Sequence, residues 1–212
     1  QYYQVTGMLV KSKVNFSNLL DQVMPKINDV LSNQGENHKL TEFVSRYIHF
    51  QNILDMGEMK FTSDYCKWAK KKGYRLNERK AAEILALAQN GIPTLPNSQS
   101  VKIAVSEAIK LIHSVEESRN TILAQMKDLC NTLPEYSVVK EMDCIGDTLA
   151  PRIIAEIGDV RRFKNKHSLI AYAGIDAPPY QSGAFHASER HISKRGNSYL
   201  RKTGYKIGRA HV

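Results

Sequence analysis

VKIAVSEAIKLIHSVEESRNTILAQMKDLCNTLP, residues 101–134, is the stretch that decides the fold class. Ten positions in it recur at alternating steps of four and three, and all but Arg119 are apolar. They are Val101, Val105, Ala108, Ile112, Val115, Arg119, Ile122, Met126, Leu129 and Leu133. This spacing predicts a long helix with a coiled-coil seam, within the chain or between chains. A long helix packed inside one domain explains the pattern equally well. Arg119, the one polar seam residue, would fix the register or the number of partners, and Pro134 should end the helix.

The segments before this helix predict shorter helices separated by breaks. Apolar residues recur at three- and four-residue steps over 1–33, 40–56 and 62–72, and again from Asn77 to about Ala88. Pro25 should kink or divide the first of these helices, and Asn77 should cap the last. The expected fold is therefore mainly α.

Composition excludes several classes of protein. The chain has 212 residues, 42% of them hydrophobic, which is enough to bury a core in one or two domains. No apolar run approaches the roughly 20 residues that span a bilayer, so we expect no membrane partner. Three widely spaced cysteines, Cys66, Cys130 and Cys144, suit neither a disulfide framework nor a four-cysteine zinc site. They favour a reducing compartment, and so a cytoplasmic location.

Positive charge is concentrated at one end of the chain. The net charge is +9, and residues 160–212 hold 11 basic and only two acidic residues, which accounts for the whole excess. A cationic segment beside a neutral body predicts a polyanion site, although a solvated basic terminus is the simpler alternative. Glycines also become frequent after about residue 140. We therefore expect a helical and coiled-coil region over 1–140 and a compact basic domain over 141–206, with the boundary near 138–142.

Two local features of the basic domain suggest contacts with a phosphate backbone. Cys144-Ile145-Gly146 precedes a short apolar helix with Pro151 in its first turn, as in a helix-hairpin-helix, where turn amides and a helix N-terminus face the phosphate. An ordinary turn between two helices has the same appearance. Further along, polar and basic residues flank a glycine, and we expect DNA-backbone contacts from Gly146, Lys194, Arg195, Asn197 and Arg201.

Five motifs occur in a fixed order in this domain. They are Glu156-Ile157-Gly158-Asp159, Arg162-Phe163, Leu169-Ile170-Ala171-Tyr172-Ala173-Gly174, Gln181-Ser182-Gly183, and Ile192-Ser193-Lys194-Arg195-Gly196-Asn197 followed by Leu200-Arg201. In this order they resemble the C-terminal transposase domain of the IS110 insertion-sequence family, which includes IS116 and IS902. Residues 1–140, with Asn18-Leu19-Leu20-Asp21 and the long helix, are similar to the helical region that links the two catalytic parts of that family.

The resemblance implies a DNA recombinase of a prokaryotic mobile element, associated with the nucleoid. Family members carry an N-terminal RuvC-like domain with four acidic residues and magnesium, and a C-terminal serine that forms a covalent phosphoserine link to DNA. The matching serine here is Ser182. A bridge RNA pairs with target and donor DNA, and helical regions assemble dimers and tetramers. His186 and His191, with the basic residues after them, would supply charge near the serine, or the histidines are simply exposed.

The chain also departs from the family pattern. The family's Gly-Ile-Gly turn has Cys144 in place of its first glycine, which weakens the expected approach to DNA there. The four-acid site should precede Gln1, because Asp55, Glu58 and Asp64 fit none of its motifs. We therefore expect a fragment that has no metal ligands or cofactor of its own and is inactive alone, with magnesium belonging to the missing domain.

The last residues carry a different signal. Lys206 to Val212 is what a common sequencing adapter encodes when it is read in frame, so residues 207–212 are expected to be an assembly artefact.

Two alternative functions remain. One is a non-catalytic nucleic-acid-binding module that uses the hairpin turn and the basic surface. The other is a structural coiled-coil protein with a basic end.

Overall fold

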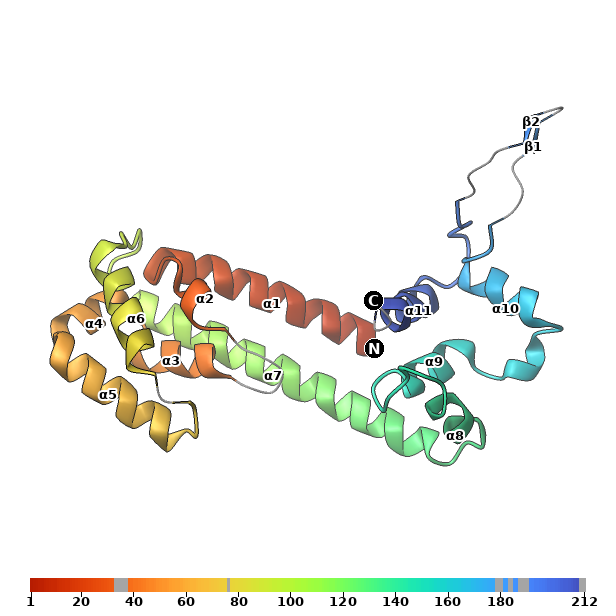
Figure 1. Cartoon of the computed structure of the whole chain (residues 1–212), viewed down its shortest axis with the longest axis horizontal. Helices are drawn as coiled ribbons and strands as arrows, with labels where there is room; N and C mark the ends of the chain where they lie inside the picture. The colour runs from red at the N-terminus through yellow and green to blue at the C-terminus, as the bar shows by residue number, and fades with distance from the viewer. Residues whose placement is uncertain (33–37, 76, 178–180, 183–184, 187–190, 210–212) are drawn as a thin grey trace. The chain divides into compact units, whose positions relative to one another are not determined.

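The computed structural model describes residues 1–32, 38–75, 77–177, 181–182, 185–186 and 191–209. The side chains of 181, 182, 185, 186, 208 and 209 are outside this description. The prediction of a mainly α protein is confirmed (Figure 1). In chain order the elements are α1 (Tyr2–Val23), α2 (Ile27–Val30), α3 (Lys39–Tyr47), α4 (Phe50–Met56), α5 (Glu58–Lys71), α6 (Glu78–Asn90), α7 (Gln99–Cys130), α8 (Glu135–Lys140), α9 (Ala150–Ile157), the 3-10 turn η1 (Val160–Arg162), α10 (Lys166–Ala173), β1 (Gln181–Ser182), β2 (Phe185–His186) and α11 (Ser198–Arg209).

Contacts divide the chain into two units, each described here by itself. The N-terminal unit is Gln4–Ser118, and the C-terminal unit is Arg119–Val212 together with Gln1–Tyr3. The division falls inside α7, so the boundary expected at 138–142 from composition lies within the C-terminal unit. Over the described residues, no helix is both long and apolar enough to cross a membrane.

Proline and asparagine act in the N-terminal unit as the sequence predicts. α1 ends at Val23 and α2 begins at Ile27, so the chain divides around Pro25, which cannot continue a helical hydrogen-bond ladder. The Asn77 side chain accepts a hydrogen bond from the Lys80 backbone N–H at 3.3 Å and caps α6.

The helix predicted over 40–56 is interrupted. Ile48 takes a left-handed conformation with φ 62°, which ends α3 and separates it from α4. The next residue, His49, begins α4, because its Nδ1 accepts from the Gln51 backbone N–H at 2.9 Å. Its Nε2 lies 3.0 Å from the Leu95 carbonyl oxygen, so both ring nitrogens have partners. A buried histidine with two backbone partners stabilises a break between helices that apolar spacing alone does not reveal.

The long helix α7 places its predicted seam in two different environments. Val101, Val105, Ile112 and Val115 are buried in the core of the N-terminal unit. Leu129, by contrast, is 71% exposed in the C-terminal unit. Packing inside one domain therefore accounts for the first half of the seam, and coiled-coil pairing through the second half stays a prediction.

A second, smaller core holds the C-terminal unit. Its buried members are Cys130, Tyr136, Ile145, Ala150 and Ile153. They come from the end of α7, from α8, from the turn after α8 and from α9. Pro151 stands in the first turn of α9, as predicted. On α11, Ile207 is partly buried against the same core.

Candidate functional site

Two glycine-containing segments of the C-terminal unit lie backbone against backbone. The Lys194 N–H donates to the Gly174 carbonyl oxygen at 3.0 Å, and the Asn197 N–H donates to the Tyr172 carbonyl oxygen. A Cβ on Gly196 would overlap the Tyr172 carbonyl oxygen, and one on Gly174 would lie 2.6 Å from the Gly196 nitrogen. Only residues without a side chain permit this approach. We call this contact the glycine junction.

Asn197 ties the glycine junction to two helices. Its Oδ1 accepts from the backbone N–H groups of Tyr199 and Leu200, at 2.9 and 3.0 Å, at the start of α11. Its Nδ2 donates to Glu156 Oε2 at 2.7 Å, which connects it to α9. The same Nδ2 lies 3.3 Å from the Tyr172 hydroxyl oxygen on α10. The Asn197 side chain therefore uses its amide nitrogen and its amide oxygen in hydrogen bonds within the protein.

A guanidinium group lies beside the Asn197 cluster. Arg162 stacks over the rings of Tyr172 and Phe163, with its Cζ 4.5 and 4.7 Å from the ring centroids. The hydrogen bond from Asn197, followed by that from Arg162, lowers the pKa of the Tyr172 hydroxyl. The structure thus brings together residues of the motifs at 156–159, 162–163, 169–174 and 192–197, which are separated in sequence.

The residues expected to contact DNA fall into two groups. Lys194 and Arg195 are exposed, and Lys194 has a left-handed backbone with φ 55°. Arg201, by contrast, donates from Nη1 to the Ala173 carbonyl oxygen at 2.9 Å, and Asn197 accepts from two backbone N–H groups at the start of α11. Because these two have internal partners, Lys194 and Arg195 are the members of the set with charge directed to solvent.

The turn expected to resemble a helix-hairpin-helix has mixed features. The Gly146 carbonyl oxygen accepts from the backbone N–H groups of Leu149 and Ala150, each at 3.0 Å, which leads the chain into α9. Cys144 has φ 63°, a conformation that favours glycine, at the position where the resembled family has glycine. The exposed Asp147 carboxylate pairs with Lys140 at 2.7 Å, and its negative charge opposes a phosphate at this turn. A phosphate grip through Gly146 stays a prediction.

Ser182 lies in a short antiparallel pair of strands. β1 pairs with β2 in the register Gln181 with His186 and Ser182 with Phe185. The backbone position of Ser182 is therefore defined, but its side chain and that of His186 are outside the described residues. In sequence, both strands lie between the two segments that form the glycine junction.

Arg152 is a buried cation that sequence reasoning missed. It is 3% exposed on α9, and its guanidinium carbon lies 5.2 and 5.0 Å from the ring centroids of Tyr2 and Tyr3. Its Nη2 donates to the Tyr3 hydroxyl at 3.1 Å and lies 3.4 Å from Thr203 Oγ1. Among the described residues its buried Nε has no hydrogen-bond partner. Burial, and then the charge of Arg152, lowers the pKa of Lys206. The sequence held one signal for this buried cation, which is that Arg152 stands among the apolar residues of α9.

The acids of the N-terminal unit do not fit a four-acid magnesium site. Asp64 accepts from Arg46 at 2.9 and 2.6 Å and from the Tyr47 hydroxyl at 2.7 Å, so its oxygens already have partners. Asp55 accepts from Gln51 Nε2 at 2.8 Å. Across the described ranges, no group composed of Asp and Glu alone lies close enough to hold one ion. We therefore derive no chemical step through magnesium.

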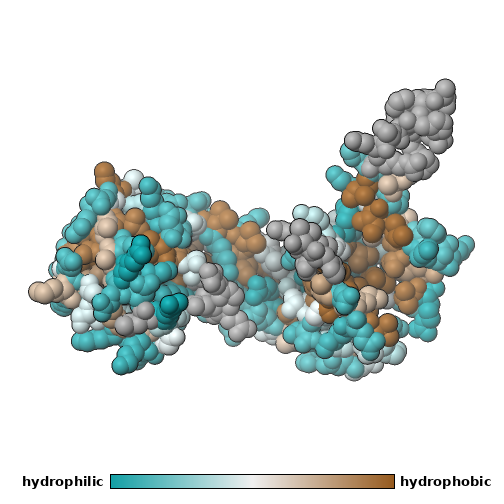
Figure 2. All heavy atoms as spheres, in the orientation of Figure 1, coloured by the Kyte–Doolittle hydropathy of each residue, from teal (hydrophilic) through white to brown (hydrophobic). Residues whose placement is uncertain are grey.

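The C-terminal unit also has an apolar groove of about 870 Å³. Its lining includes Leu129, Leu133, Val138, Met142, Ile154 and Leu169. Figure 2 shows hydrophobic side chains at the surface of this unit. Such a groove suits apolar side chains rather than phosphates.

Comparison with known protein families finds a match in the C-terminal part of the chain. Residues 136–212 match the family model described as Transposase IS116/IS110/IS902 family. No curated protein and no solved structure matches the chain. The match covers about a third of the chain, within the C-terminal unit, and makes this part of the chain similar to an insertion-sequence transposase family.

Proposed function

We propose that this chain acts in the transposition of an insertion sequence, with Ser182 as the nucleophile that becomes joined to DNA. The observation that carries the proposal is the glycine junction, which brings together motifs that occur in family order within the matched residues 136–212. In sequence, Ser182 lies between the two segments that meet at this junction. A nucleophile can be held in position for attack only if the chain on either side of it is fixed, and the junction does this.

The proposed step is a phosphoryl transfer. The Ser182 oxygen loses its proton and bonds to phosphorus as the bond from phosphorus to the leaving DNA oxygen breaks, and that oxygen takes up a proton. A serine hydroxyl needs activation, and the transfer depends on in-line positioning and neutralised phosphate oxygens. We assign that neutralisation to Lys194 and Arg195, which are exposed close to the glycine junction in sequence.

DNA binding tests the role of these two cations. Replacing both Lys194 and Arg195 by alanine should weaken binding to duplex DNA and reduce the slope of log K against log salt by about 1.8, or about 0.9 for each phosphate contact that is lost. A matched double variant removes the exposed cations Arg79 and Lys110 of the N-terminal unit. Fluorescence anisotropy across a salt series measures both. Equal losses in the two double variants would show nonspecific attraction only.

Covalent adducts test the role of Ser182. We expect Ser182→Ala, in a transposase that also carries the magnesium domain, to abolish protein–DNA adducts on denaturing gels and to leave DNA binding intact. Ser198→Ala is the control, because Ser198 is an exposed serine at the start of α11. If adducts persist in Ser182→Ala, the nucleophile is another residue. If the wild-type protein binds DNA but forms no adduct, the chain is a non-catalytic nucleic-acid-binding module.

We further propose that the protein works as a homo-oligomer with a bridge RNA in the cytoplasm. The exposed seam residue Leu129 and the apolar groove beside it support a contact between subunits. Leu129→Glu should lower the oligomeric mass measured by light scattering, whereas Met59→Glu, at another exposed apolar residue, should not. An unchanged mass in both variants would place the contact elsewhere. The proposed bridge RNA is tested by purification. RNA that copurifies with the protein and is removed by ribonuclease would support it.

A further inference from the structure

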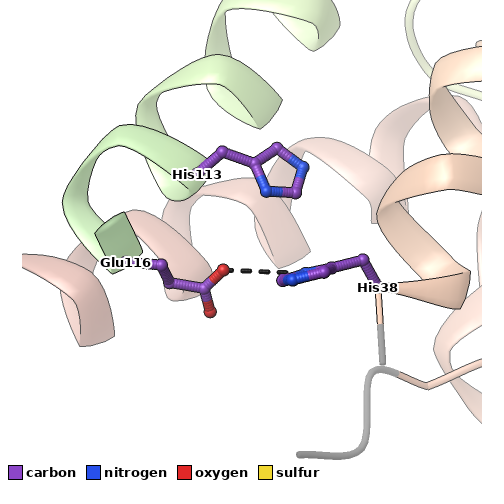
Figure 3. A group of neighbouring side chains, drawn as sticks. All are labelled: His38, His113 and Glu116. Carbon is purple, nitrogen blue, oxygen red and sulfur yellow. Dashed lines mark ion pairs between the residues drawn. The ribbon is translucent and has the colours of Figure 1, made fainter. Parts of the chain in front are cut away.

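Three potential metal ligands meet in the N-terminal unit, whereas the residues assigned to transposition belong to the C-terminal unit. His38 stands directly before α3, and His113 and Glu116 lie on α7. A spacing of three residues places His113 and Glu116 on one face of that helix. One ligand atom from each of the three residues lies within 4.8 Å of the other two. Figure 3 shows the two imidazole rings and the carboxylate directed toward one another.

The Glu116 carboxylate has one oxygen available for a ligand. Its Oε1 pairs with Lys13 Nζ at 2.6 Å. Its Oε2 is buried and, among the described residues, has no hydrogen-bond partner. The His38 Nδ1 is 3.6 Å from this oxygen, which is too long for a hydrogen bond. A buried oxygen without a hydrogen-bond partner destabilises the fold, and a bound cation would remove that penalty.

The two imidazoles also have ring nitrogens available. The His38 and His113 rings meet edge to face, with centroids 4.9 Å apart and an interplanar angle of 68°. In the part of the chain that the structure describes, no hydrogen bond reaches a ring nitrogen of His113. His49 differs, because both of its ring nitrogens have backbone partners. His38 and His113 therefore have a free coordinating capacity that His49 lacks.

The donor set selects the class of ion. Two imidazoles and one carboxylate are a zinc ligand set, with water in the fourth position, whereas Mg²⁺ and Ca²⁺ prefer oxygen ligands throughout. Tetrahedral bonds of 2.0–2.2 Å put ligand atoms about 3.3–3.5 Å apart. The His38–Glu116 separation of 3.6 Å is already close to this value. All three residues are partly exposed, which leaves room for the ion to enter and for a bound water.

We propose that His38, His113 and Glu116 form a Zn²⁺ site that fastens the start of α3 to α7. The site joins residues 75 positions apart in sequence, so the ion binds the folded unit and not the unfolded chain. Lys13 is the competing cation. It holds the other oxygen of Glu116, so zinc binding does not require it to leave.

Metal titration of the purified chain, prepared without a histidine tag and treated with chelator, tests the site. We expect one Zn²⁺ per chain by calorimetry, an increase in melting temperature with Zn²⁺, and visible absorption bands from Co²⁺ in a site of low coordination number. His113→Ala and Glu116→Gln should each weaken Zn²⁺ binding by at least about tenfold and remove the Co²⁺ bands. His167→Ala, which removes an exposed histidine on α10, should leave both unchanged.

Lys13→Met separates zinc binding from a simple ion network. If the three residues bind zinc, the affinity of Lys13→Met for Zn²⁺ should equal or exceed that of the wild type, because a competing cation has been removed. If Glu116 instead serves only to pair with Lys13 and His38, Zn²⁺ produces no shift in melting temperature in either protein, and the proposal is overturned. Zinc binding that survives in His113→Ala, shown by circular dichroism to be folded, overturns it as well.

Discussion

Gly196→Ala tests whether the glycine junction holds the C-terminal unit together. The added Cβ would overlap the Tyr172 carbonyl oxygen and lie 2.5 Å from the Gly174 nitrogen, and both are backbone atoms that cannot rotate away. Overpacking of this kind costs about 1–3 kcal/mol. Separating the segments also weakens the hydrogen bonds from the backbone N–H groups of Lys194 and Asn197, each worth about 1 kcal/mol. Alanine also lowers the conformational entropy of the unfolded chain, which offsets about 0.4–1 kcal/mol of this loss. The net expected loss is about 2–4 kcal/mol.

Gly204→Ala is the matched control, with the opposite sign. Gly204 lies within α11, and an added Cβ there has nothing within 4 Å. The same chemical change should therefore stabilise the unit by up to about 1 kcal/mol, because alanine favours the helix. One pair of variants thus separates the junction from the general effect of replacing glycine.

Hydrogen exchange followed by mass spectrometry measures both variants locally. A loss of 2 kcal/mol should speed exchange in α9 and α10 by about 30-fold. The single tryptophan, Trp68, is buried in the N-terminal unit, so its fluorescence midpoint in urea should stay unchanged. Exchange in Gly196→Ala equal to wild type would refute the argument from close backbone contact.

Three further predictions follow from single side chains. Cys144→Gly should stabilise the protein by about 1 kcal/mol in thermal unfolding, since Cys144 has φ 63°; unchanged stability would contradict strain at this turn. The hydrogen bond from Arg46 lowers the pKa of the Asp64 carboxyl in the folded state, so its stabilisation is present above the unfolded pKa of about 3.9 and is lost as pH falls through the folded pKa. Asp64→Asn should therefore be less stable than wild type near pH 7, with a gap in urea midpoint that closes in acid; a gap independent of pH would refute this. Arg152→Ala should cost about 2–4 kcal/mol, through lost contacts with Tyr3 and a cavity, whereas Arg152→Met should cost less because it restores the packing; equal losses in calorimetry would show that packing is irrelevant there.

Local signals in the sequence predicted the helices well. Asn77 caps its helix through its own side chain, Pro25 lies where the first helix divides, and Pro151 stands in the first turn of α9. Each of these residues acts on neighbours within four positions, so its effect can be read from the sequence directly. The break at Ile48 was missed, because its partner His49 depends on Leu95, which is distant in sequence.

The candidate site was predictable in its parts but not in its assembly. The motifs around Gly174 and Gly196 were recognised as separate pieces, and only the structure shows that they touch. Asn197 was expected to contact DNA, yet its side chain is bonded to Glu156 and to the start of α11. Whether it also contacts DNA stays a prediction.

The proposed zinc site was also beyond the sequence, which led us to expect no metal ligands. His113 and Glu116 share a face of a helix, as unrelated surface residues often do. Their partner His38 belongs to a different element and carries no motif. Side chains so far apart in the chain become a ligand set only when tertiary packing unites them.

The glycine junction has a practical consequence for protein engineering. The hydrogen bond from the Lys194 amide to the Gly174 carbonyl fixes the two ends of the intervening stretch, so we expect changes of length between these ends to be tolerated. Lengthening a closed loop is cheap, about 0.6 kcal/mol for each doubling. A photocrosslinker or an added segment could therefore be placed between the two ends while both anchor glycines are kept.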